Sequence, residues 1–124
     1  LMGVDLSRAD LTESILENAQ IKNSFLTGAD IRTANLKNAD LEGSDLSGAK
    51  LTKTNFYQAN LKGANLHRAD LEHADVSQAN LSQADLSGAK LADANFSNAI
   101  LTDADLSGAD QTDTNFSNAK GLKK

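Results

Sequence analysis

The chain contains no cysteine, proline or tryptophan and few aromatic residues. One tyrosine and four phenylalanines occur among its 124 residues. Without cysteine, neither a disulfide framework nor a thiolate metal site is possible. An ordinary globular core would also be short of large side chains, because aromatic residues supply much of the buried bulk in such cores.

The chain also lacks an excess of positive charge and any long apolar run. Its net charge of −5 argues against non-specific binding to nucleic acid or to an anionic membrane. No apolar segment approaches the roughly 20 residues that a spanning helix needs. No signal peptide is visible, but the first residues are already in phase with the repeat described below, so residue 1 need not be the natural start. We expect a soluble protein whose compartment the sequence does not determine: the cytoplasm, or the periplasm or thylakoid lumen if a targeting segment has been removed.

A five-residue repeat runs from one end of the chain to the other. A large apolar residue, which we call the central residue, recurs at every fifth place from Leu6 to Leu106, without insertion or deletion. Asp or Asn usually precedes it, at the Asx position, and Ala usually precedes the Asx position. The last two residues of each unit are the first and second turn positions. Gln111 is the first clear break, and Phe116 resumes the phase. The exceptions to Ala are Val4, Ser14, Ser24, Ser44, Thr54 and Thr114.

A period of five is incompatible with a continuous helix or strand. On an α-helix each step of five advances by about 140°, so the central residues would point to all sides. On a flat strand an odd period would place successive central residues on opposite faces. The side chains gather only if the chain turns a corner in every unit, with Ala and the central residue inward and the other three residues outward. Glycine at the second turn position, as in Gly48, fits a tight turn with positive φ.

The recurring unit Ala-(Asp/Asn)-Leu-x-x resembles the pentapeptide-repeat family over almost the whole chain. The resemblance implies an all-β fold, a right-handed quadrilateral β-helix with four repeats to each turn. We therefore predict a single domain over residues 1–124 with about six coils.

If four repeats complete one turn, residues twenty apart in the sequence lie in one column along the rod. Grouping the residues in this way, which we call sorting by twenty, provides a check on four repeats per turn. All phenylalanines at central positions then fall on one face, and another face carries only leucine. We predict that these residues form the structural core: Leu6, Leu26, Leu46, Leu66, Leu86, Leu106, Phe56, Phe96 and Phe116.

No residue stands out as catalytic, cofactor-binding or metal-binding. His67 and His73 fall on outward turn positions without convergent partners. The segment from Asp103 resembles the start of a calcium loop, but its twelfth position is Thr114 instead of the required Glu. Three glycosylation sequons, at Asn80, Asn95 and Asn115, are chance products of the repeat.

The outward columns carry charges and amides. Lys50 and Lys90 each fall between aspartates on neighbouring coils, and Lys22, Glu42 and Lys62 form a short ladder of alternating charge. A column of amides is predicted to bond along the axis. Such columns either form a binding surface for a partner or stabilise the stack of coils through contacts between side chains. We favour the second interpretation. The amide column is Asn18, Asn38, Gln58, Gln78, Asn98 and Asn118.

Three apolar residues, Ile15, Phe25 and Ile100, occupy outward positions that are otherwise polar. They are candidate partner contacts, and Phe25 is the best of them.

With no nucleophile–base pair and no ligand cluster, the sequence predicts a protein that is not an enzyme and uses no cofactor. Solenoids usually offer regular surfaces to macromolecular partners. The first hypothesis is a monomeric protein-interaction or scaffold module with an unknown protein partner. The alternative, implied by the resemblance to quinolone-resistance members of the family, is a DNA mimic that binds a type II topoisomerase such as gyrase.

Overall fold

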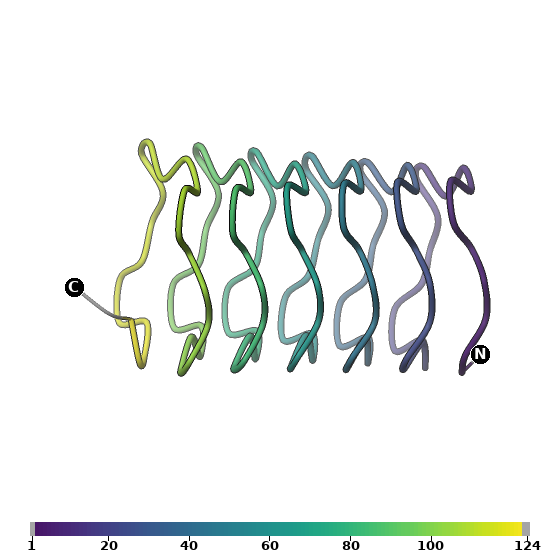
Figure 1. The fold of residues 1–124 in the computed structure, drawn as a ribbon, viewed down its shortest axis with the longest axis horizontal. Coiled ribbons are helices and arrows are strands. Elements are labelled where there is room, and N and C mark those ends of the chain that lie inside the picture. Colours follow the sequence, from purple (N-terminus) through teal and green to yellow (C-terminus); the bar gives the residue numbers. More distant parts are fainter. Residues whose placement is uncertain (1, 123–124) are drawn as a thin grey trace.

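The chain winds as a stack of similar coils, with its two ends at opposite ends of a rod (Figure 1). The computed structural model describes residues 2–122. Parallel β-bridges join each Asx position to the one twenty residues later, from Asp5–Phe25 to Ile100–Lys120. Four repeats therefore complete one turn, as the family resemblance implied and the sorting by twenty supported. Within residues 2–122 there is no helix, and each bridge involves a single residue, so no longer strand is present.

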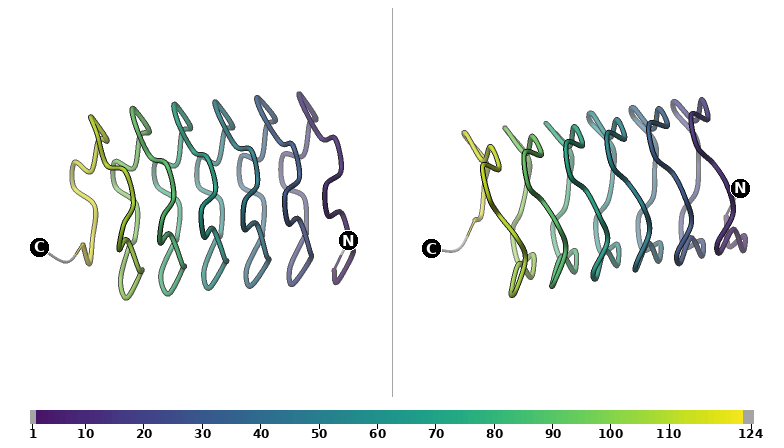
Figure 2. Two further views of the ribbon diagram at one scale, coloured as in Figure 1. Left: turned by 45° about the horizontal axis from the view of Figure 1, so that its top comes forward. Right: turned by 90° about the horizontal axis from the view of Figure 1, so that it is seen from above.

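Figure 2 shows the stacked coils from two further sides. We number the four faces of the rod by the central residues of their first complete repeats. Face 1 begins with Leu6, face 2 with Leu11, face 3 with Leu16 and face 4 with Ile21. Each face is a column of repeats twenty residues apart, so every outward position also forms a column along the rod. This geometry places each surface residue next to those twenty residues before and after it.

Hydrogen bonds between coils fix this register. The N–H of a central residue donates to the carbonyl of the Asx position in the next coil, as from Leu46 to Asn65 at 2.7 Å. The N–H of the second turn position donates to the next coil too, from Gly48 to His67 at 2.9 Å. In the other direction, the N–H of Asp45 donates to the previous coil. Each repeat thus gives two N–H groups forward and one backward.

A tight turn closes each repeat. The carbonyl of Leu46 accepts a hydrogen bond from the N–H of Ala49 at 3.0 Å, and φ is +65° at Gly48, the second turn position. Positive φ at that position alone defines a type II turn. Residues with side chains adopt the same φ, for example Arg68 at 57° and Asn98 at 60°. Glycine is therefore compatible with this corner but is not required by it.

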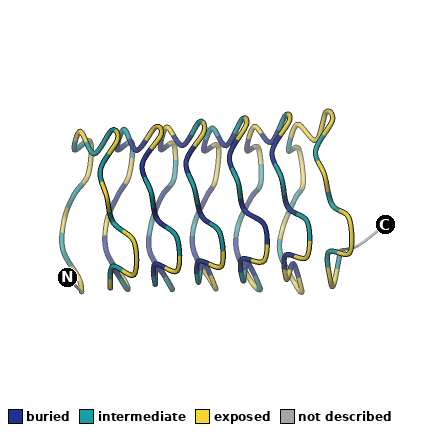
Figure 3. Ribbon diagram, turned by 180° about the vertical axis from the view of Figure 1, so that it is seen from behind, coloured by how far each residue is buried: buried dark blue, intermediate teal, exposed yellow. Residues whose placement is uncertain are grey.

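Central residues and the alanines before them line the inside of the rod. Phe56 and Phe96 are completely buried, and the rings of Phe96 and Phe116 lie 5.5 Å apart between centroids. In the outermost coils the same positions are only half-buried, which includes Leu6, Leu106 and Phe116, because these coils have a neighbour on one side only (Figure 3).

Hydroxyl residues replace alanine inside the rod without leaving polar atoms unpaired. Thr54 donates its hydroxyl to the carbonyl of Ile31 at 2.8 Å, and Ser44 donates to the carbonyl of Ile21 at 2.6 Å. Each bond joins a coil to the one before it. No buried side-chain nitrogen or oxygen among the described residues lacks a partner, so these substitutions avoid the desolvation cost of an unsatisfied hydroxyl.

We predict that Phe56→Ala lowers the free energy of unfolding by about 3–5 kcal/mol, as expected for a large aromatic side chain removed from a packed core. Tyr57→Ala, one place outward, should cost far less, because Tyr57 is only partly buried and its ring contacts the ammonium of Lys37 at 5.8 Å. Urea unfolding of both variants measures the difference. Similar losses for the two would contradict the assignment of inward and outward positions.

Candidate interaction surface

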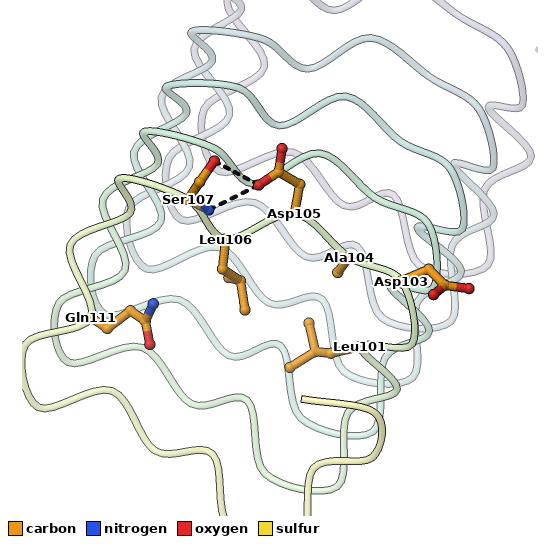
Figure 4. A pocket seen from close by; sticks show the side chains of 7 residues that line it. All are labelled: Leu101, Asp103, Ala104, Asp105, Leu106, Ser107 and Gln111. Atoms are coloured by element: carbon orange, nitrogen blue, oxygen red, sulfur yellow. Dashed lines mark hydrogen bonds between the residues drawn. The ribbon is translucent and has the colours of Figure 1, made fainter. Parts of the chain in front are cut away.

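The outward aspartates and asparagines close the turns of their own repeats. Asp105 accepts hydrogen bonds from the N–H of Ser107 at 2.9 Å and from its hydroxyl at 2.7 Å (Figure 4). Asp10 accepts the same two bonds from Thr12, at 3.1 and 2.7 Å. A bond from the Asp or Asn side chain to the backbone two residues on is a common way in which these residues stabilise turns. Much of the acidic surface is therefore part of the turn structure.

These hydrogen bonds lower the pKa of several carboxyls. Bonds from Thr12 and Thr112 stabilise the ionised forms of Asp10 and Asp110 and hold their pKa values below the ordinary one. The Arg32 guanidinium, 2.7 Å from Asp30, has the same effect on the pKa of that carboxyl.

Three apolar side chains occupy Asx positions and project from the rod. Phe25 is 52% exposed, Ile15 is 84% exposed and Ile100 is 37% exposed. They lie on faces 1, 3 and 4, respectively, so the fold does not bring them together into one patch. Each also deprives its turn of the side-chain acceptor, because neither a ring nor an aliphatic chain can accept a hydrogen bond.

The charged columns form fewer contacts than their spacing suggests. Backbone β-bridges place Lys50 between Asp30 and Asp70, as the sequence predicted. Among the described residues, however, neither Lys50 nor Lys90 forms an ion pair within 4.0 Å. The ladder on face 4 has its first step, since Lys22 lies 3.8 Å from Asp40 and 4.0 Å from Glu42.

The predicted amide column forms one hydrogen bond among the described residues. Gln58 donates to Gln78 at 3.2 Å. Hydrogen bonding between these amides therefore joins one pair of neighbouring coils and does not extend along the whole rod.

The two histidines lie on different faces and have separate partners. The Nδ1 atom of His67 is 2.8 Å from the hydroxyl of Ser87, and that hydroxyl donates to Asp85. His73 lies 3.8 Å from Asp93. The bond from Ser87 to Asp85 is the turn bond found in other repeats, so this group of residues follows from the repeat. No group of side chains suited to holding a metal ion occurs within residues 2–122.

The described surface has open hollows, of which two bear on binding. One, of about 430 Å³, lies in the last coil, where Leu101, Leu106 and Gln111 point into the interior of the rod (Figure 4). The other, of about 420 Å³, lies at the corner between faces 2 and 3 and includes Arg32, Thr52 and Lys53. Sequence reasoning missed this second hollow, although a lysine at the Asx position before Thr52 was a visible departure from the repeat.

The fold and its surface define a non-globular repeat protein, a β-helix solenoid whose outward columns are available for contact. A family model for pentapeptide repeats matches residues 1–38, 39–78 and 79–118, so the chain belongs to the pentapeptide-repeat family. Members of this family are generally non-enzymatic interaction modules. No curated protein matches the chain. Within residues 2–122 no helix is long and apolar enough to cross a membrane.

Solved structures of pentapeptide-repeat proteins, known as right-handed β-helices, share the fold. HetL of the cyanobacterium Nostoc, involved in heterocyst differentiation regulation, is 36% identical over 90% of this chain, with a TM-score of 0.60. A second Nostoc protein is 42% identical over 69% of this chain and 69% of its own length, with a TM-score of 0.65. A protein of the Arabidopsis thaliana thylakoid lumen is 28% identical over 94% of this chain, with a TM-score of 0.50. The chain spans 59% of the length of HetL and 61% of that of the Arabidopsis protein.

The lowered pKa values predict that stability falls in acid. A folded-state pKa below the unfolded value, ordinarily 3.8 for Asp, means that the ionised carboxylate stabilises the fold. This contribution is fully present above the unfolded pKa and is lost as the pH falls through the lower folded pKa. The urea midpoint should therefore drop below about pH 4. The double variant Asp10→Asn, Asp110→Asn should show a smaller drop, since Asn keeps the acceptor oxygen but does not titrate.

The control is Glu13→Gln, whose carboxylate accepts no hydrogen bond from a described residue. An acid profile of the Asp10/Asp110 variant that matched those of the wild type and the Glu13→Gln control would contradict the assignment.

Proposed function

We propose that this protein is a non-catalytic interaction module, a right-handed rod of about six coils that binds a protein partner through face 1. The observation that supports it most directly is Phe25, an aromatic side chain that is 52% exposed in a column otherwise made of aspartates and an asparagine. Aromatic residues are enriched among those that contribute most to binding at protein interfaces.

Face 1 is also the face whose corners carry the glycines of the turns. Seven glycines occupy second turn positions, and all of them lie at the two corners that border face 1. Side chains do not crowd several of these corners, because a Cβ added at Gly3, Gly48 or Gly63 would meet no atom within 4 Å. Residues with side chains hold the same backbone conformation at the other two corners, so φ alone does not explain why the glycines gather beside face 1. Bare corners let a partner approach the backbone closely. The seven are Gly3, Gly28, Gly43, Gly48, Gly63, Gly88 and Gly108.

The charge of face 1 indicates the partner's chemistry. Its Asx column carries Asp5 and Asp45 on either side of Phe25, with Asp85 and Asp105 further along the rod. A partner that fits would present an apolar pocket for Phe25 flanked by lysine or arginine. Complementary charges of this kind contribute mainly to specificity and to the rate of association.

Replacement of Phe25 by Asn separates binding from folding. Asn restores the side-chain acceptor that the turn N–H of Thr27 lacks among the described residues, so the melting temperature should stay equal or rise. Binding should weaken by roughly 30-fold, the equivalent of about 2 kcal/mol for an aromatic at the centre of an interface. The measurement compares proteins captured from a cell extract by the wild type and the variant, followed by titration of the captured partner.

Ile15→Asn and Ile100→Asn are matched controls on faces 3 and 4. They make the same kind of change and should reduce binding less than Phe25→Asn. If all three variants bound the captured protein as the wild type does, apolar contact at these positions would be excluded and the assignment of face 1 would be wrong.

The alternative function is DNA mimicry directed at a type II topoisomerase, and the aspartates of face 1 are the feature that favours it. The neighbouring column on face 2 does not fit, because Lys50 and Lys90 interrupt it. The net charge of −5 is also modest for a mimic of duplex DNA. The quinolone-resistance protein QnrB1 is only 18% identical, with a TM-score of 0.40, a likeness too low to support any inference about activity.

We therefore expect no potent inhibition of DNA gyrase by the purified protein in a supercoiling assay. Inhibition at or below about micromolar concentration, abolished by Asp85→Asn and Asp105→Asn together, would reverse the ranking of the two functions. The Asn variants keep the turn acceptors, so they remove charge while preserving the fold.

A further inference from the structure

Face 2 contains repeats in which a carboxylate is held by a threonine. One oxygen of Asp10 accepts both the N–H and the hydroxyl of Thr12, at 3.1 and 2.7 Å. One oxygen of Asp110 accepts the same pair from Thr112, at 3.1 and 2.6 Å. These two repeats show how the first turn position of face 2 binds a carboxylate oxygen with two donors.

Thr52 occupies the same position in the same column, but its repeat has lysine in place of the aspartate. Neither the N–H nor the hydroxyl of Thr52 has an acceptor among the described residues, and Lys50 lies at the Asx position with an exposed ammonium. The repeat therefore keeps both donors for a carboxylate oxygen and replaces the carboxylate by a cation.

The surroundings of Thr52 add positive charge to an acidic protein. Thr52 lies in the open hollow of about 420 Å³ at the corner between faces 2 and 3, which is also lined by Lys53 and Arg32. Arg32 is paired with Asp30 at 2.7 Å, whereas Lys50 and Lys53 form no ion pair within residues 2–122. Lys53 and the two donors of Thr52 thus share one hollow, and Lys50 lies two residues before Thr52 in the Asx column of face 2.

We propose that Thr52 and Lys50 form a binding site for a carboxylate, supplied by an acidic side chain of the protein partner. The carboxylate oxygen would take the place that Asp10 and Asp110 fill in their own repeats, and Lys50 would pair with its charge. Hydrogen bonds to a charged acceptor are stronger than those between neutral groups. This inference rests on the proposed function, and it adds a second contact on the face next to Phe25.

The local charge favours a carboxylate over a phosphate or sulfate. Asp70 and Glu72, one coil further along face 2, and Glu13 at the edge of the hollow repel a doubly charged anion more strongly than a singly charged one. The two donors of Thr52 converge on a single oxygen in the repeats that serve as a template, so a tetrahedral anion gains little from its additional oxygens.

The molecule provides its own weaker version of the site. Lys90 also replaces an aspartate in this column, but the first turn position after it is Ala92, which offers an N–H and no hydroxyl. If the threonine hydroxyl and the lysine act together, a carboxylate should bind at Thr52 more tightly than at Ala92.

The test is amide NMR spectroscopy of the full chain, titrated with acetate and, separately, with a peptide of six glutamates. The Thr52 amide should move progressively and saturate, the Ala92 amide should move less, and the Thr12 amide should stay in place because its acceptor is already present. Lys50→Gln should weaken binding by about two- to fivefold, as expected for an exposed ion pair, and added salt should weaken it further.

Lys50→Asp is the decisive variant. It supplies the missing carboxylate from within the chain, so the Thr52 amide should shift toward the position of the Thr12 amide without any probe and should no longer respond to acetate. The melting temperature of this variant should equal or exceed that of the wild type. That result would exclude misfolding as the reason for the lost response.

Three results would overturn the proposal: no movement of the Thr52 amide, an unchanged response in Lys50→Asp, or a larger response to inorganic phosphate than to acetate and the peptide. The proposed function is tested separately by Phe25→Asn. If that variant lost no binding while Thr52 still bound acetate, the carboxylate site would stand and the role of Phe25 would not. If Phe25→Asn lost binding while Thr52 did not respond, the opposite would hold.

Discussion

The hydrogen bonds between successive coils are the interaction on which the rest of this structure depends. Each repeat donates two N–H groups to the next coil and one to the previous coil, at a fixed offset of about twenty residues. Since no strand extends beyond one bridged residue within residues 2–122, no local element could persist alone. Burial of the central residues and closure of the turns both require the neighbouring coil to be in register, so folding is expected to be cooperative between adjacent coils.

Most of the fold could be predicted from the sequence because its information is periodic. The five-residue phase from Leu6 to Leu106 places the inward positions, and sorting by twenty placed the phenylalanines of face 3 in one column, where the rings of Phe96 and Phe116 are in contact. The bond from the Asx side chain to the turn also followed from residue type. Four repeats per turn came from the family resemblance, since spacing alone does not determine how sharply the chain bends at each corner.

The candidate surface was harder to predict, because it depends on departures from the repeat and on what lies next to them in space. Phe25 was visible as an apolar residue at an outward place, but the gathering of seven glycines at the two corners of face 1 emerged only when the repeats were assigned to faces. Thr52 gave no signal by itself, since threonine is common at turn positions. Its importance depends on Lys50 replacing the acceptor that Asp10 provides to Thr12, which is a comparison between coils.

The separation between a five-residue inner period and a twenty-residue outer period has a consequence for how such chains change in length. Insertion of one repeat leaves every downstream central residue inward, so the alternation of inward and outward positions is kept. The same insertion rotates every downstream side chain by one face, which would move Lys50 and Thr52 out of line with Asp10 and Asp30. Insertion of four repeats restores the original columns. Variation by single repeats therefore keeps the inward pattern and yet reshuffles the surface, while variation by whole coils lengthens the rod and keeps its surface pattern.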